Sequence, residues 1–228
     1  MTRQIFASAL FAGLAAGVLA ALLQFAFVVP LLLEGELFET GARVHFAGAD
    51  GVPQSVAGGV GLSAELGRHL GTLAMNLIAY TGFALVLVAG FALAQRAGHR
   101  VTPRSGLVWG LAGFVAVQLA PAAGLPPELP GTTATDLGLR QGWWALCVAT
   151  TAAGLGLIAF GRGALALAGA VVLILLPHVV GAPHLDTYFG IAPPELSALF
   201  ATRSLAVAAA SWVVLGLVAA TFWSRETP

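Results

Sequence analysis

Charged side chains are scarce in this sequence: only 9% of the residues are Asp, Glu, Lys or Arg, and no lysine occurs at all. A soluble globular domain carries about 25% charged residues, so the chain is not an ordinary soluble domain. Hydrophobic residues make up 58% of it, and the mean hydropathy is +0.91. The formal net charge is zero, which leaves no basic excess for nucleic acid. These values predict an integral membrane protein.

Several kinds of chemistry are also missing from the sequence. The single cysteine, Cys147, lies in an apolar stretch without a disulfide partner and is expected to be a small buried side chain. No phosphate-binding loop occurs, which excludes an ATPase. No Asp, Glu, Lys or Arg lies within the middle of an apolar run, and this argues against autonomous proton-driven transport. No nucleophile with an adjacent base and no compact metal-ligand motif occurs, so we expect no enzyme and no bound cofactor.

Six continuous apolar runs are long enough to cross a bilayer, which takes about 20 mostly apolar residues. Because the runs do not alternate with polar residues, we expect an all-α membrane protein rather than a barrel. The expected spans, within one polytopic membrane domain over residues 1–228, are 5–33, 70–94, 105–123, 142–160, 164–180 and 204–223. Only Gly161-Arg162-Gly163 separates the fourth span from the fifth, and two glycines permit a tight turn there.

The arginines predict how these spans are oriented. Six arginines fall in the two tails and the even-numbered loops: Arg3, Arg96, Arg100, Arg104, Arg162 and Arg225. The odd-numbered loops hold the other four: Arg43, Arg68, Arg140 and Arg203. Since cytoplasmic loops carry an excess of positive charge, we expect both termini in the cytoplasm and a multi-pass protein of the cell's inner (cytoplasmic) membrane.

Acidic residues are distributed even more unevenly than the arginines. Only Glu226 falls on the predicted inner side, and the outer side holds Glu34, Glu36, Glu39, Asp50, Glu65, Glu128, Asp136, Asp186 and Glu195. Acidic side chains contribute little to topology, so one interpretation is a functional outer face that attracts cations. The other is that short inner loops have no room for further charges.

Each odd-numbered span ends in a proline that is followed by a glutamate. The pairs are Pro30 with Glu34, Pro121 with Glu128, and Pro177 with Glu195, and the tetrapeptide PPEL occurs twice, at 126–129 and 193–196. The returning helix in each case opens on an arginine: Arg68, Arg140 and Arg203. This pattern predicts three outward-facing helical hairpins as pseudo-repeats, whose interfaces hold the binding site in many transporters. Prolines also end membrane helices for structural reasons alone.

The three arginines at the starts of returning helices are expected to be paired with glutamates. An arginine is unfavourable on the outer side and at the positive end of a helix dipole. The preceding loops supply the nearest carboxylates. We therefore expect ion pairs at the outer rim, first of all Glu128 with Arg140 and Glu195 with Arg203.

Three amide side chains are expected inside the spans: Gln24, Asn76 and Gln118. They could join neighbouring helices by hydrogen bonds or line a path for an ion, and the frequent use of polar residues in helix packing favours the first role. The motifs Gly13-x-x-x-Gly17 and Gly106-x-x-x-Gly110 are typical of close helix contacts, although the pattern is common.

We call the segment where each odd-numbered span ends at its proline and leads to its glutamate an outer exit. The third outer exit, after Pro177, differs from the other two by its histidines, His178 and His184. Imidazole and carboxylate groups are suitable ligands for borderline divalent ions such as Co²⁺ and Ni²⁺. The candidate metal ligands are His178, His184, Asp186, Glu34, Glu128 and Glu195. His178 follows Pro177, where a helix loses a regular hydrogen bond, so its ring could equally cap a free backbone carbonyl.

Five segments together resemble the CbtA family of cobalt transporter subunits. They are RQIFASALFAGL at 3–14, FVVPLLLEGELFE at 27–39, GLVWGLAGFVAVQLAPAAGLPPELPG at 106–131, RQGWW at 140–144 and LPHVVGAP at 176–183. The resemblance implies a multi-span subunit that takes up cobalt for cobalamin synthesis beside CbtB, a small single-span partner with a histidine motif. Many similar proteins carry a histidine-rich first outer loop. Here that loop has His45 alone, with His69 at the following helix start, so the resemblance does not extend to metal capture by the loop.

Two functions from different classes therefore remain open. The first is a transport component, in which an outer vestibule receives a divalent cation and partner subunits, with possible copies of this chain, complete the path. The second is a membrane scaffold or assembly subunit that binds another protein and has no ion path of its own.

Overall fold

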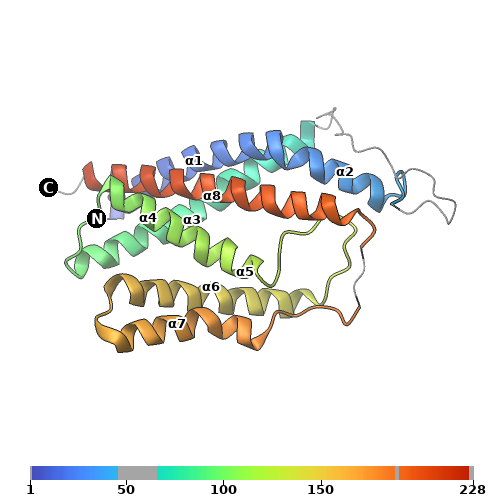
Figure 1. The fold of residues 1–228 in the computed structure, drawn as a ribbon. Coiled ribbons are helices and arrows are strands. Elements are labelled where there is room, and N and C mark those ends of the chain that lie inside the picture. Colours follow the sequence, from blue (N-terminus) through green and yellow to red (C-terminus); the bar gives the residue numbers. More distant parts are fainter. Residues whose placement is uncertain (1, 46–65, 188–189, 226–228) are drawn as a thin grey trace. The chain divides into compact units, whose positions relative to one another are not determined.

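The computed structural model describes residues 2–45, 66–187 and 190–225, and all regular elements in these ranges are helices (Figure 1). In chain order they are α1 (Thr2–Phe27), α2 (Val29–Glu39), α3 (Leu66–Arg96), α4 (Pro103–Phe114), the π-helix η1 (Val115–Leu119), α5 (Ala120–Ala122), α6 (Leu137–Phe160), α7 (Gly163–Val180) and α8 (Pro194–Arg225). Asp50, Glu65 and most of the first outer loop lie outside the described residues.

Six helical stretches are long and apolar enough to cross a membrane. They are Arg3–Phe27, Leu66–Arg96, Pro103–Ala122, Leu137–Phe160, Gly163–Val180 and Pro194–Arg225. The third stretch combines α4, η1 and α5. The predicted number of spans and their helical type are therefore confirmed, while the three-hairpin plan and the side on which the termini lie remain predictions.

The range of the first predicted span, 5–33, holds two helices in the structure. Helix α1 ends at Phe27, Val28 forms a turn, and α2 begins at Val29 with Pro30 in its first turn. A proline is tolerated there because the first N–H groups of a helix have no partner in the helix. The end of the predicted span and the first residues of the loop expected after it therefore form a second helix.

The helix that contains the last predicted span, 204–223, begins ten residues before it. Helix α8 starts at Pro194 and has Glu195 in its first turn, two features that are typical of a helix start. The earlier copy of PPEL, at 126–129, is not helical. The same four residues thus form an irregular segment in one place and open a helix in the other, although both leucines, Leu129 and Leu196, are buried.

The chain forms two compact units. Unit 1 contains residues 1–24, 64–115 and 206–228, and unit 2 contains residues 25–63 and 116–205. Unit 1 holds most of α1, α3, α4 and the later part of α8, and unit 2 holds α2, α5, α6, α7, nearly all of η1 and the start of α8. The expectation of one polytopic domain over 1–228 remains a prediction.

Glycines allow the helices of unit 1 to approach closely. A Cβ atom on Gly13 would lie 2.5 Å from the Cα of Thr81, and one on Gly17 would lie 2.9 Å from the Cα of Leu77. These contacts make α1 and α3 antiparallel. The other predicted motif behaves in the same way, because a Cβ atom on Gly106 would lie 2.5 Å from the Gly216 carbonyl oxygen of α8. Both glycine motifs are confirmed as close-packing faces.

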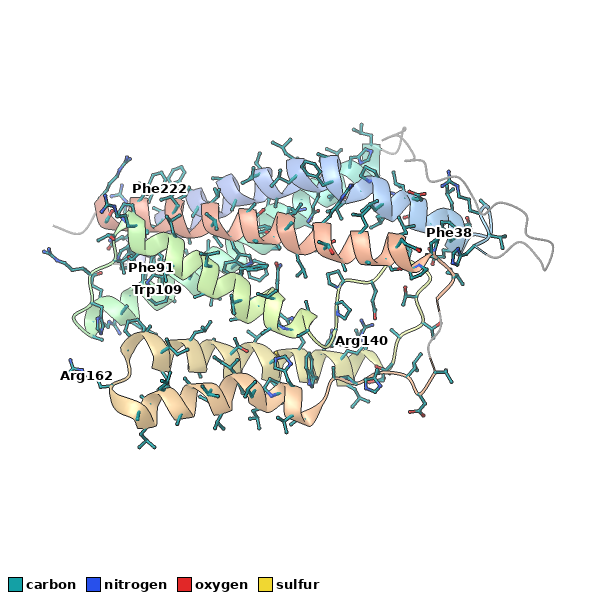
Figure 2. The ribbon with its side chains drawn as sticks, in the orientation of Figure 1. Phe38, Phe91, Trp109, Arg140, Arg162 and Phe222 are labelled. Atoms are coloured by element: carbon teal, nitrogen blue, oxygen red, sulfur yellow. The ribbon has the colours of Figure 1, made fainter. Side chains whose placement is uncertain are left out.

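Aromatic side chains also fill space between the helices of unit 1, and two of them, Trp109 and Trp212, pack against the glycines Gly90 and Gly113. The rings of Phe91 and Trp109 meet edge to face with centroids 5.3 Å apart, and Figure 2 shows this contact between α3 and α4. Trp212 of α8 stacks on Phe83 of α3 at 5.0 Å. Such pairs contribute about 0.5–1.5 kcal/mol beyond the area that they bury.

In unit 2, α6 and α7 are antiparallel neighbours joined by a tight turn (Figure 1). A Cβ atom on Gly154 would lie 2.7 Å from Ile174, so α7 packs directly on the backbone of α6. At the turn, Gly163 has a φ angle of +77°, which a residue with a side chain rarely adopts. The glycines that flank Arg162 therefore form the predicted turn.

Candidate functional site

Pro177 lies inside α7, and its carbonyl oxygen binds two donors. The indole Nε1–H of Trp143 donates to it at 2.9 Å from α6, and the backbone N–H of Gly181 donates at 3.0 Å. Gly181 has a φ angle of +87°, which ends the helix. Next along the chain, the half-buried His178 places its ring edge to face with that of Trp143, with centroids 6.0 Å apart. The indole thus fixes both the end of α7 and the place of its histidine.

A second carbonyl, that of Val117 in η1, also accepts a hydrogen bond from a tryptophan. Pro121 follows four residues later and lacks the N–H that would normally bond this carbonyl. The indole of Trp144 donates to it at 3.2 Å. π-helical turns are often found at functional sites, and this one contains Gln118, whose buried Oε1 has no hydrogen-bond partner within the described residues.

The third case is the end of α1. The carbonyl of Phe27, in the last turn before Pro30, accepts a hydrogen bond from the guanidinium of Arg203 at 3.4 Å. Carbonyls in the last turn of a helix lack partners within that helix. A side-chain donor from another helix therefore binds a backbone carbonyl near each of the three prolines. The sequence did not predict that side chains donate to these carbonyls, although the adjacent tryptophans of RQGWW are two potential donors.

One of the two predicted ion pairs at these exits is present in the structure and the other is not. Arg140 at the start of α6 donates to Glu128 at 2.7 Å. Between Glu195 and Arg203 the described residues contain no ion pair, and Arg203 donates to the Phe27 carbonyl instead. Both lie on α8, and eight residues of helix separate them by about 12 Å along the axis, which is too far for an ion pair.

Glu34 has a partner that the sequence did not predict. Arg43 donates to it at 2.9 Å, and only 11% of the Glu34 side chain is exposed, compared with 32% for Glu128. The partner is nine residues further along the chain and lies beyond the end of α2. The sequence did not predict that the chain continues as helix α2 after Pro30. This helix brings Arg43 close enough to bind Glu34.

The six candidate metal ligands all belong to unit 2. Glu34 and Glu128 are in ion pairs, His178 lies in the last turn of α7, and His184, Asp186 and Glu195 are exposed. In the described parts of the chain, no three His, Cys, Asp or Glu residues are close enough to hold a metal ion. The candidates thus share one unit but do not form a complete ligand set there.

The amides Gln24 and Asn76 belong to unit 1 and bind each other. The Nδ2 of buried Asn76 donates to Gln24 Oε1 at 2.9 Å and to the Thr72 carbonyl at 2.8 Å. The first bond joins α1 to α3, which is the packing role that the sequence analysis favoured for these two residues. Gln118 differs from them, because its carbonyl oxygen has no partner in the described structure.

The model of the family described as "Probable cobalt transporter subunit (CbtA)" matches residues 2–224. No curated protein and no solved structure matches the chain. The family match includes nearly all of both units and of the six stretches that are long and apolar enough to cross a membrane. The protein therefore belongs to the CbtA family of probable cobalt transporter subunits and is a multi-pass membrane protein.

Proposed function

We propose that this chain is the membrane subunit of an uptake system for a divalent transition metal, cobalt, in the cytoplasmic membrane. The cation is received at an acidic outer face by His178 and His184, and the metal serves cobalamin synthesis. Both termini lie in the cytoplasm, and residues 1–228 act as a single membrane domain built on three hairpins. The family match across residues 2–224 is the observation that carries this proposal.

The ion pairs of unit 2 divide the candidate ligands into two groups. Glu34 and Glu128 are held by arginines, which compete with a cation for the same carboxylate oxygens. The imidazoles of His178 and His184 and the exposed carboxylates of Asp186 and Glu195 are the groups that we assign to the metal. Nitrogen and oxygen ligands of this kind suit Co²⁺ and Ni²⁺ alike, so geometry decides between the two ions.

A partner subunit completes the ligand set in this proposal. The described residues contain no group of three metal ligands, and a transition metal ion is held by several ligands at once. A small single-span protein with a histidine motif, of the kind represented by CbtB, would add imidazoles where α7 ends. His178 is held beside Trp143 at that point, which keeps its ring in one place for a partner to meet.

The proposal is tested by cobalt accumulation in cells that express this chain with and without its partner. We expect uptake only from the pair, and a clear loss of uptake in the His178→Ala variant. The Thr187→Ala variant is a matched control, because it changes an exposed polar residue of the same segment without removing a proposed ligand. Unchanged uptake in His178→Ala would remove this residue from the ion path.

A membrane scaffold without an ion path is the second candidate function. It is favoured by the hydrogen bond between Gln24 and Asn76, which assigns two of the three intramembrane amides to helix packing. A scaffold would stabilise a partner subunit without moving metal itself. If cells accumulate no cobalt in any combination, while removal of this chain lowers the level of the partner in the membrane, the scaffold is the better description.

A further inference from the structure

Five arginines mark one end of unit 1. They are Arg3, Arg96, Arg100, Arg104 and Arg225, and all five are exposed. Arg3 lies at the start of α1, Arg225 ends α8, and the other three lie at the α3 end, in the α3–α4 connection and in the first turn of α4. We call this group the basic end of unit 1.

Contacts within unit 1 bring the four helix ends together (Figure 1). Gln4 of α1 donates a hydrogen bond to the Trp223 carbonyl of α8 at 3.0 Å. The rings of Phe91 in α3 and Trp223 meet at 6.3 Å. A Cβ atom on Gly106 of α4 would lie 2.5 Å from Ala220 of α8. Each arginine is within about two turns of one of these contacts, so the positive charges share one end of the bundle.

Few carboxylates oppose these charges. The described part of unit 1 contains no Asp or Glu, and none of the five arginines forms an ion pair with a described residue. In the sequence, Glu226 is the one acidic residue of the tails and the loop that carry the basic end. The basic end therefore has an excess of four positive charges. Within the described residues, Arg140 and Arg43 are each paired with a glutamate, whereas the five arginines of the basic end have no carboxylate partner.

Aromatic residues flank the same end. Trp109 lies in the second turn of α4, after Arg104, and Trp223 lies in the last turn of α8, before Arg225. Arg225 is 5.8 Å from the ring centre of Phe222. Tryptophans in this position are typical of the boundary between lipid and water. We therefore expect the arginines to lie at the level of the lipid headgroups.

We propose that the basic end of unit 1 binds the phosphate groups of anionic lipids in the leaflet that it faces. A guanidinium group offers paired N–H donors that match two phosphate oxygens. Clusters of four to eight basic residues next to a membrane span are typical of sites for anionic lipid. In the orientation that the arginines predict, this leaflet is the cytoplasmic one. The site is independent of metal uptake and of the proposed metal ligands in unit 2.

The binding of a fluorescent phosphatidylglycerol to the purified full-length chain in neutral detergent tests the proposal, with phosphatidylcholine as the reference lipid. We expect the unmodified chain to prefer phosphatidylglycerol. The Arg100→Gln and Arg104→Gln variants should each bind phosphatidylglycerol about fivefold more weakly. Arg162→Gln is the matched control, because Arg162 is exposed in the turn of unit 2 and lies outside the basic end. This control should bind as the unmodified protein does.

Two further measurements use the unmodified chain and therefore do not depend on how well the variants fold. The preference of the unmodified chain should fall when the ionic strength rises from about 0.05 M to about 0.5 M, since salt screens exposed charges. Inorganic phosphate at millimolar concentration should not displace the lipid, and complete displacement would assign the site to a soluble phosphate instead. Equal binding of both lipids, or an equal loss in Arg162→Gln and Arg100→Gln, would overturn the proposal.

Discussion

Trp143 donates its indole N–H to the carbonyl of Pro177 at 2.9 Å and thereby ties the end of α7 to α6. The tryptophan side chain is 7% exposed, so this hydrogen bond forms out of contact with water. His178 is the next residue and lies against the same indole. Replacement of the tryptophan should therefore affect both the stability of unit 2 and the position of its histidine.

We predict that Trp143→Phe lowers the free energy of unfolding by about 1 kcal/mol, because interhelical hydrogen bonds in membrane proteins contribute on that order. The measurement is the thermal unfolding midpoint of the purified chain in detergent. Trp212→Phe is the matched control, since Trp212 is also buried but its Nε1 has no hydrogen-bond partner within the described residues. A midpoint that falls no further for Trp143→Phe than for Trp212→Phe would contradict a stabilising role for this bond.

The amide pair of unit 1 supports a second prediction. Gln24→Leu and Asn76→Leu should each destabilise the chain, and the double variant should lose less than the sum of the two, with a coupling energy of about 0.6 kcal/mol. Unfolding in a graded denaturant gives the three values. Cobalt accumulation should persist in the double variant, because both amides serve packing. If Asn76→Leu abolishes uptake in a chain that is as stable as the original, Asn76 belongs to the ion path instead.

The sequence predicts the six spans because their signal is local and strong. An apolar run of about 20 residues has few alternatives to a membrane helix, since lipid cannot satisfy an open backbone. The turn at Arg162 and the glycine motif that starts at Gly13 are also local, as each depends on the absence of a side chain at a fixed position. These features could be predicted from neighbouring residues alone.

The details of the exits could not be predicted, because they depend on residues that are distant along the chain. The donors from Trp143 and Arg203 reach carbonyls that are 34 and 176 residues away. The partner of Glu34 is Arg43 because α2 continues the chain as a helix, a feature that hydropathy did not separate from α1. The start of α8 at Pro194 did have a local signal in its Pro-Glu sequence, but the identical residues at 126–129 are not helical. Tertiary context decides between the two outcomes.

The two ion pairs of unit 2 should differ in their effect on stability. We predict that Arg43→Ala destabilises the chain more than Arg140→Ala, because Glu34 is 11% exposed and would be left with an uncompensated charge, whereas Glu128 is 32% exposed and can be hydrated. For Arg140→Ala we expect a loss of about 0–1 kcal/mol. Thermal unfolding at neutral pH compares the two variants.

A second substitution at Glu34 separates loss of the charge pair from loss of packing. Addition of Glu34→Gln to Arg43→Ala should recover part of the lost stability, because it removes the buried carboxylate charge that Arg43→Ala leaves without a partner. The Glu128→Gln change should give no comparable recovery in the Arg140→Ala background. Equal losses for the two arginines, with no recovery in either background, would show that the exposure of the carboxylate does not govern the strength of these pairs.

The contact between α4 and α8 gives the largest predicted effect on stability. A Cβ atom on Gly216 would lie 2.7 Å from both the Cα and the N of Gly110 and closer still to the Gly106 carbonyl oxygen, all of them backbone atoms that cannot turn aside. We therefore predict that Gly216→Ala lowers the free energy of unfolding by about 1–3 kcal/mol through overpacking. Gly156→Ala is the matched control, because Gly156 is also inside a membrane helix but a Cβ atom there meets nothing within 4 Å. Since alanine is the better helix former by up to about 1 kcal/mol, this control should be neutral or slightly stabilising. Thermal unfolding of the two variants in the same detergent compares them, and a Gly216→Ala chain as stable as Gly156→Ala would mean that α4 and α8 are not in close contact at this position.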